Sequence, residues 1–288
     1  MTSRPKLARI ALAAAIPAVA LLTGLGTAAS ATASTTPAAT QRAQAAAVAR
    51  AAIKNIVVGS QHSPTLKVTH RSTGIKGLSQ VESTNWAGYA DTGSSFSKVT
   101  ASWTEPTGVS SGSTTSLAAF WVGIDGYSSA SVEQDGTLIE SYEGTVYYYD
   151  WWEIYPENDV QVVDSVSPGD HITSTVTRSG SRYTLSVTDS THTADSFSTT
   201  QTYSGAADSS AEWIAEAPSG SSGVYPLTDF GTWTDSSSSV TEGSTSGVIS
   251  SFTDDEITQI NGTTSAVEDQ PGSLNSSGNG FTATWKSS

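Results

Sequence analysis

The chain of 288 residues contains no cysteine. This absence excludes disulfide bonds, thiolate metal sites and cysteine nucleophiles, so the folded protein must be held by its core alone. Histidine is scarce as well, since residues 82–288 contain only His171 and His192, both in polar sequence typical of a surface. Neither accompanies a GxSxG motif, and the chain has no HExxH motif, no clustered His/Asp set and no glycine-rich loop before a helix. We therefore predict no metal site and no cofactor, and expect the chemistry to come from carboxylates, amides and hydroxyls.

Lysine and arginine are almost absent from the larger part of the chain. Residues 1–81 hold nine of the 13 basic residues and no acid, whereas residues 82–288 hold four bases and all 27 acids, a formal charge of −23. Self-repulsion of this size weakens as carboxylates become protonated, which favours an acidic working environment. The alternative is that the acidity merely keeps a secreted protein soluble. Either way, such a surface argues against nucleic acid or an anionic membrane as a partner.

The N-terminal 33 residues have the features of a secretory signal peptide. Three basic residues within the first nine precede an apolar run over residues 10–25, and small residues at 29–33 provide a cleavage site. The run is short for a membrane-spanning helix of about 20 apolar residues, and no second run follows. We therefore expect an extracellular protein that does not contact the membrane once the signal has been removed.

The composition predicts three regions: a signal peptide over 1–33, a basic propeptide over 34–81 and a single acidic domain over 82–288. Because the propeptide is basic and the domain acidic, we expect the propeptide to cover the acidic cleft as an intramolecular inhibitor. A passive linker is the alternative. We expect the protein to be a monomer.

The acidic domain has the sequence texture of short strands. No long amphipathic helix is expected after residue 82, and residues 179–181 resemble the tip of a hairpin. Alternation of apolar and polar residues predicts strands at four places, around residues 99–103, 160–162, 172–176 and 183–187. Short strands at this spacing over about 200 residues predict an all-β sandwich or barrel.

Residues 91–93 read DTG, the loop motif of pepsin-like aspartic peptidases. That mechanism needs two aspartates that share a proton, and no second DTG or DSG motif is present. We interpret the motif at Asp91 as a turn between strands and keep a pepsin-like peptidase as an alternative function.

Five short motifs carry the most specific information. They occur in the order NWAGY at 85–89, WVGIDG at 121–126, VEQDG at 132–136, WWEIYP at 151–156 and AEWIAE at 211–216. Together they resemble the glutamic peptidases, also called eqolisins or peptidase family G1, over about 200 residues from Asn85 to the C-terminus, and indicate a secreted, bacterial-type member. The resemblance implies a single-domain sandwich of two curved antiparallel sheets, of the concanavalin or jelly-roll type. It also implies an acid endopeptidase that acts on proteins and peptides.

By motif, the catalytic glutamine and glutamate of that family correspond to Gln134 and Glu212. Peptide hydrolysis needs a base that takes a proton from water and a donor for the oxyanion that forms. Glu212 can be the base, and the amide of Gln134 can hold the water and stabilise the oxyanion without itself titrating. The reference pKa of about 4.3 for glutamate suits an acidic optimum.

The resemblance also implies a substrate groove around this pair. The corresponding groove residues are Trp86, Trp121, Trp151 and Tyr155. The acidic residues near the pair, Asp125 and Glu153, are also expected to bind substrate. Core packing is the alternative for the tryptophans, because each buries a large area. The chain departs from the fungal members at Tyr149, which stands where they have an aspartate, with Asp150 one place later.

Two further alternatives stay open at this point. A β-sandwich glycosidase needs two carboxylates about 5 to 9.5 Å apart. Glu212 and Glu216 share a face of one strand, but four residues of strand separate their backbones by about 13 Å. A carbohydrate-binding module would explain exposed aromatic residues without any catalysis.

Overall fold

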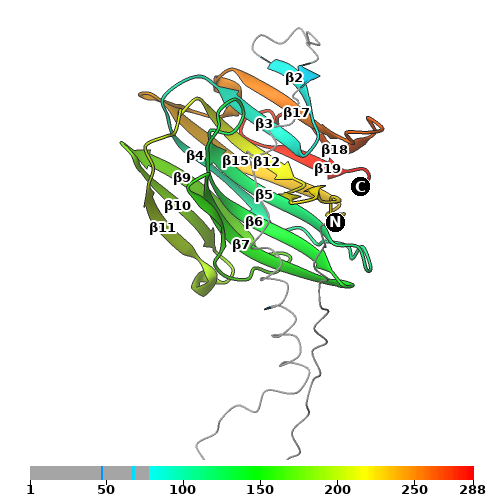
Figure 1. The fold of residues 1–288 in the computed structure, drawn as a ribbon. Helices are drawn as coiled ribbons and strands as arrows, with labels where there is room; N and C mark the ends of the chain where they lie inside the picture. The colour runs from blue at the N-terminus through cyan, green and yellow to red at the C-terminus, as the bar shows by residue number, and fades with distance from the viewer. Residues whose placement is uncertain (1–46, 48–66, 69–77) are drawn as a thin grey trace, which may run out of the picture. The chain divides into compact units, whose positions relative to one another are not determined.

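The computed structural model describes residue 47, residues 67–68 and residues 78–288 (Figure 1). The signal peptide predicted over 1–33 lies outside the described residues, as does most of the propeptide predicted over 34–81. Every described residue belongs to one compact unit, Gln41–Ser288. Among the described helices, none has the length and apolar character needed to cross a bilayer.

Two β-sheets form the described domain. The first sheet contains, in spatial order, β2 (Leu78–Ser83), β17 (Asp254–Ile260), β3 (Trp86–Thr92), β12 (Ser210–Glu216), β5 (Ser116–Ile124), β6 (Val132–Tyr142), β7 (Thr145–Tyr155) and β8 (Asn158–Val162). The second contains β16 (Thr245–Gly247), β15 (Thr232–Glu242), β4 (Phe96–Thr104), β9 (His171–Ser179), β10 (Arg182–Asp189) and β11 (Phe197–Thr202). Neighbours are antiparallel except β2 and β17, which run parallel.

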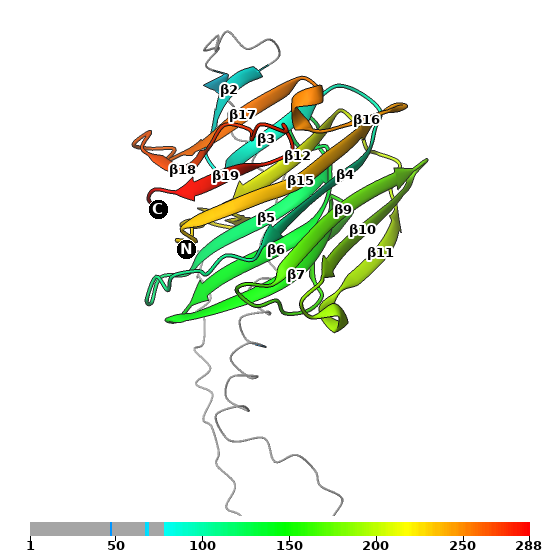
Figure 2. The same ribbon diagram turned by 180° about the vertical axis from the view of Figure 1, so that it is seen from behind.

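The two sheets are connected through one long strand. The first part of β15 pairs with β19 (Phe281–Trp285), which continues through β18 (Val267–Pro271) to β17. The remaining elements are short: β1 (Lys67–Val68), β13 (Ser219–Gly220), β14 (Gly223–Val224) and the 3-10 helices η1 (Thr193–Asp195) and η2 (Ile249–Ser251). Figures 1 and 2 show β9, β10 and β11 side by side at one edge of the second sheet. The predicted sandwich of antiparallel sheets is confirmed.

The strands of the second sheet form where alternation predicts them. Along β9 and β10 each buried residue alternates with a more exposed one, as expected for strands with a single buried face. The two strands pair closely at Ser179 and Arg182, and Gly180 adopts a φ of 63° in the turn between them. Glycine tolerates this left-handed conformation without steric cost, so the predicted hairpin tip is confirmed.

Aromatic side chains fill the space between the sheets. The ring of Phe120 from β5 stacks on Trp233 from β15, with centroids 5.3 Å apart, and Trp233 meets Trp103 from β4 edge-on at 5.7 Å. The indole of Trp213 on β12 donates a hydrogen bond of 3.1 Å to the carbonyl of Thr100 in the other sheet. This core occupies one face of β5 and β12, so their alternate residues point to the opposite face.

The structure corrects the interpretation of the DTG motif. Asp91 is not in a turn: it lies within β3, completely buried, and the loop to β4 begins at Gly93. Aspartate and threonine are common turn residues, but pairing with β12 on one side and β17 on the other extends the strand to Thr92. The turn therefore begins at Gly93, two residues later than the motif predicts.

The edge strand β2 crosses the boundary predicted between residues 81 and 82. It pairs with β17 from Leu78 to Ser83, and β1 pairs with it in turn. Residues 78–81 are therefore part of the first sheet in this form of the chain, while the position of cleavage stays a prediction.

Candidate active site

Gln134 and Glu212 lie on the same face of the first sheet, on either side of one glycine. Gly123 of β5 pairs directly with Glu212 of β12 and with Gln134 of β6. Directly paired residues of antiparallel strands project from the same face. The two side chains therefore point the same way from backbones two strands apart, or about 9.6 Å. We call this face, which is opposite to the sandwich core, the site face.

The glycine between them is required by close packing. A Cβ atom at position 123 would lie 2.8 Å from the ring of Trp121 and 3.3 Å from the Cβ of Gln134. The absence of a side chain therefore lets the Trp121 ring lie over Gly123, between the strands that carry Gln134 and Glu212.

A second carboxylate orients the amide of Gln134. The amide nitrogen donates a hydrogen bond of 2.7 Å to Oε2 of Glu153, its directly paired neighbour on β7. Burial raises the pKa of Glu153 well above its usual range; the hydrogen bond from Gln134 offsets part of this, and Glu216 adds to it. One of the two amide hydrogens is thereby used to fix the plane of the Gln134 side chain.

Glu212 is completely buried, and its surroundings disfavour its charged form. Burial raises its pKa well above the usual range, Ser210 and the backbone at Tyr127 offset part of the rise, and the nearby Asp125 and Glu133 increase it. An acid with a raised pKa is a stronger base when it is ionised and holds its proton over a wider pH range when it is not. At about pH 3–4 such a group is almost entirely protonated in the folded protein, so a role as a base there requires that bound water or substrate lowers its pKa.

Glu216, four residues beyond Glu212 on the same face, connects two of the sequence motifs. Its Oε2 accepts a hydrogen bond of 2.9 Å from the indole of Trp121, and its Oε1 accepts one of 3.1 Å from the amide of Asn85. Both residues belong to the sequence motifs, which predict no role for Asn85 and for Glu216 only the glycosidase alternative. Their function here is to hold the Trp121 ring in place beside Gly123.

The predicted groove tryptophans form a layer next to this row. Gly136 of β6 pairs with Trp121 of β5 on one side and with Trp151 of β7 on the other, so both tryptophans project from the same face. The ring of Trp86 meets that of Trp121 edge-on, with centroids 5.1 Å apart. All three are buried on the site face, and Tyr155 is half-buried at the end of β7 on the same face. Their burial agrees with the alternative that the tryptophans are core residues. Their position also agrees with the groove prediction, because they lie beside Gln134 and Glu212.

Comparison with known proteins identifies the family to which the chain belongs. The model of the Peptidase A4 family matches residues 84–276, about two thirds of the chain. The chain belongs to the Peptidase A4 family. Aspergillopepsin-2 of Aspergillus niger is 29% identical over 187 residues, which cover 56% of this chain and 65% of the relative. This chain therefore matches slightly less than two thirds of that relative's length.

Solved structures agree with this assignment. Scytalido-glutamic peptidase with a peptide-based transition state analogue superimposes with a TM-score of 0.60 at 24% identity, covering 70% of this chain and 98% of the other. Aspergilloglutamic peptidase from Aspergillus niger gives a TM-score of 0.50 at 26% identity, covering 59% and 99%. The resemblance to the glutamic peptidases and the sandwich fold are both confirmed.

In this Peptidase A4 family member, the side chain of Asp125 accepts hydrogen bonds from three backbone amides. Its Oδ2 accepts hydrogen bonds from the amides of Ala207 (2.8 Å) and Asp208 (2.7 Å), and its Oδ1 from the amide of Ser209 (2.8 Å). Both oxygens are used to fix the loop that leads into β12. The geometry favours a role in positioning the strand that carries Glu212 over the predicted role in substrate contact.

The departure at Tyr149 is not compensated by the next residue. Asp150 pairs with Thr137 and points away from the site face, where it accepts a hydrogen bond from the backbone amide of Asp164. Tyr149 lies on the site face, buried, with its ring 6.4 Å from that of Tyr147. This member therefore has a phenol where the fungal members have a carboxylate, and Asp150 stabilises a loop instead.

Proposed function

We propose that this chain is a secreted acid endopeptidase that hydrolyses peptide bonds with Glu212, Gln134 and an activated water, without a covalent intermediate. The observation that carries the proposal is the row formed by Glu212, Gly123 and Gln134 on one face of the first sheet. A base and an amide that project from the same face of the sheet can act together on one water and one scissile carbonyl.

The roles follow from the contacts of each group. Ionised Glu212 takes a proton from the water as it attacks the carbonyl, and the amide of Gln134 stabilises the oxyanion. Protonated Glu212 then gives its proton to the leaving amine. Glu153 positions the Gln134 amide through the bond of 2.7 Å, and it does so in either protonation state because a neutral carboxyl retains an acceptor oxygen.

The pepsin-like alternative is disfavoured by the placement of Asp91. That residue pairs with Asp254 of β17, so two carboxyl groups do lie next to each other. Both side chains, however, project from the face of the first sheet opposite to the site face. The glycosidase alternative is disfavoured because Glu216 is held by Trp121 and Asn85.

Digestion of a soluble protein at about pH 3–4, near the reference pKa of glutamate, tests the proposal. We expect hydrolysis by the chain after removal of its N-terminal segment, with no inhibition by pepstatin and no hydrolysis by the Glu212→Gln variant. Inhibition by pepstatin would instead support the aspartic alternative, and binding of polysaccharide without proteolysis would support the carbohydrate-binding one.

The proposal extends to secretion and to inhibition by the basic segment over 34–81. That segment carries six of the chain's 13 basic residues and no acid, so it should bind the acidic domain near neutral pH and dissociate as carboxylates become protonated. A synthetic peptide of residues 34–81 should therefore inhibit the mature enzyme more strongly as the pH is raised from the acidic range. A peptide that fails to inhibit at any pH would exclude this role.

A further inference from the structure

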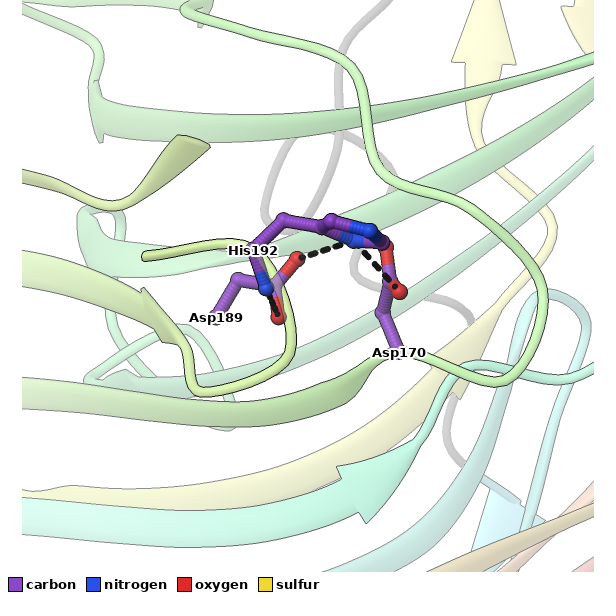
Figure 3. Close-up of side chains that lie close together, drawn as sticks. All are labelled: Asp170, Asp189 and His192. Carbon is purple, nitrogen blue, oxygen red and sulfur yellow. Dashed lines mark hydrogen bonds and ion pairs between the residues drawn. The ribbon is translucent and has the colours of Figure 1, made fainter. Parts of the chain in front are cut away.

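Three potential metal ligands meet at one end of the second sheet. Asp170 directly precedes β9, Asp189 is the last residue of β10, and His192 directly precedes η1. One ligand atom from each lies within 4.8 Å of the others. Figure 3 shows the His192 imidazole between the two carboxylates. The site face of the first sheet is on the other side of the sandwich core, so this cluster is separate from Gln134 and Glu212.

The distances within the cluster suit a shared ion. The Nδ1 atom of His192 lies 3.0 Å from Oδ1 of Asp170 and 3.8 Å from Oδ2 of Asp189. Two ligand atoms that each lie about 2.1 Å from one metal ion are about 3.0 Å apart in octahedral geometry and about 3.4 Å apart in tetrahedral geometry. Small side-chain movements therefore bring all three atoms to bonding distance of one ion.

Backbone amides already orient both carboxylates. Oδ2 of Asp170 accepts a hydrogen bond of 2.7 Å from the amide of Ser167, which turns Oδ1 toward His192. Oδ1 of Asp189 accepts bonds from the amides of Thr191 (2.7 Å) and His192 (2.9 Å), which turns Oδ2 toward the same point. Hydrogen bonds to the outer oxygen of a ligand are the usual way in which a metal site is held in shape.

One inward oxygen has no hydrogen-bond partner. The side chain of Asp189 is completely buried, and its Oδ2 accepts no hydrogen bond from any described residue. The Nδ1 atom of His192 can carry a single hydrogen, and the nearer acceptor is Asp170 at 3.0 Å. Buried carboxylate oxygens are normally paired or bound to metal, so this oxygen is available to a cation.

We propose that Asp170, Asp189 and His192 bind a divalent transition-metal ion, for which zinc is the natural probe. An imidazole nitrogen with two carboxylate oxygens is a ligand set that zinc accepts, whereas calcium prefers oxygen ligands alone. His192 has a side chain 55% exposed, so the ion can enter from solvent and complete its coordination with water. The ion would tie the loop before β9 to the loop after β10. Sequence motifs do not predict this cluster, because 18 residues lie between the two aspartates and the usual zinc motifs do not have that spacing.

Calorimetric titration of the full chain with zinc chloride at about pH 7 tests the proposal. We expect one ion per chain, and a rise in Tm of about 5–10 °C at a zinc concentration 100 times the Kd. Calcium should bind at least about tenfold more weakly.

Two variants remove ligands by different routes. His192→Ala changes an exposed side chain, and Asp189→Asn keeps an oxygen for the amides of Thr191 and His192; each should weaken zinc binding at least about tenfold. His171→Ala is the matched control, because His171 is the neighbouring exposed histidine and contacts Thr104 instead of the cluster. The histidines of residues 34–81 stay in every variant, so zinc held there would be unaffected by these changes. Absence of zinc binding, or an affinity that neither ligand variant lowers, would overturn the proposal.

Discussion

At the residue scale, two acidic side chains hold Gln134 and the strand of Glu212 in position. Glu153 fixes the amide plane of Gln134, and Asp125 fixes the loop that leads to Glu212. Such supporting contacts matter because a base and an oxyanion donor contribute to catalysis only when they are held at the right distance from the reacting atoms. In the proposed mechanism, Gln134 and Glu212 contribute different parts of the reaction, so loss of either should be severe.

Glu212→Gln and Gln134→Ala should each lower kcat by at least about 10²-fold, the scale of losing a general base or an oxyanion donor. Glu212→Gln conserves the shape of the side chain, so its Tm in the acidic range should change little, whereas Gln134→Ala also removes the buried hydrogen bond to Glu153 and should lower Tm. Glu143→Gln is the matched control, since Glu143 is an exposed carboxylate in the turn between β6 and β7. Steady-state kinetics on a peptide substrate, after maturation with an added protease, would measure the effect. Near wild-type turnover in either variant would show that the pair has been assigned incorrectly.

At the element scale, β5 is the strand around which the site is arranged. All nine of its residues are buried, with one set in the sandwich core and the other on the site face. A strand buried on both faces shows no alternation of apolar and polar residues. This is why strand patterns predicted β4, β8, β9 and β10, each with one more exposed face, while β5 was located only through its motif.

The identity of Gln134 and Glu212 could be predicted from family motifs, but their relationship could not. It depends on register, because a shift of one residue in the pairing of β12 with β5 would turn Glu212 into the core. The role of Asp125 was equally hidden, since its backbone partners lie more than 80 residues later in the chain. Both depend on contacts between distant parts of the sequence, which local patterns do not report.

Gly123→Ala tests the packing around β5. The added methyl group would meet the Trp121 ring at 2.8 Å, so either the ring or Gln134 must move. We expect kcat/KM to fall at least about tenfold and the free energy of unfolding to fall by about 1–3 kcal/mol, as for other overpacked sites. Gly262→Ala, at an exposed loop position where the added methyl group lies 3.3 Å from the half-buried Thr84 side chain and needs only a small shift of it, should change neither quantity appreciably. Unchanged kinetics in Gly123→Ala would mean that the Trp121 ring plays no part in arranging the site.

At the scale of the whole molecule, the domain has many buried carboxyl groups and few cations to pair with them. Among the described residues, Arg178 and Asp208 form the one ion pair between an arginine or lysine and an acid, at 2.7 Å. Burial raises the pKa of Asp91 to about 9, of Glu133 to about 9 and of Glu105 to about 8. These groups are neutral in the folded protein under acidic conditions, so their burial there needs no counter-charge.

The consequence for stability has a definite sign. Carboxyl groups in the unfolded chain ionise near pH 4, whereas these groups in the folded protein keep their protons up to about pH 8–9. Between these limits the folded state holds more protons than the unfolded state, so the free energy of unfolding falls as the pH rises. Each fully shifted group contributes a slope on the order of 1.4 kcal/mol per pH unit. The protein should therefore be most stable in the acidic range and lose stability toward neutrality, in agreement with the acidic function proposed.

Asp91→Asn separates this effect from catalysis. Besides burial, the carboxylates of Asp254, Glu242 and Asp255 raise the pKa of Asp91, and asparagine imitates its neutral form without being able to ionise. The variant should match the wild type in Tm at about pH 4 and exceed it by several degrees at about pH 7, because the unfolded wild type gains free energy by ionising Asp91 and the unfolded variant does not. Most of the peptidase activity should remain, since Asp91 points away from the site face. Differential scanning calorimetry at both pH values, with Glu143→Gln as the exposed-carboxylate control, measures the difference. Equal pH dependence in variant and wild type would show that Asp91 is ionised in the folded protein, and loss of activity with normal folding would return the aspartic mechanism to consideration.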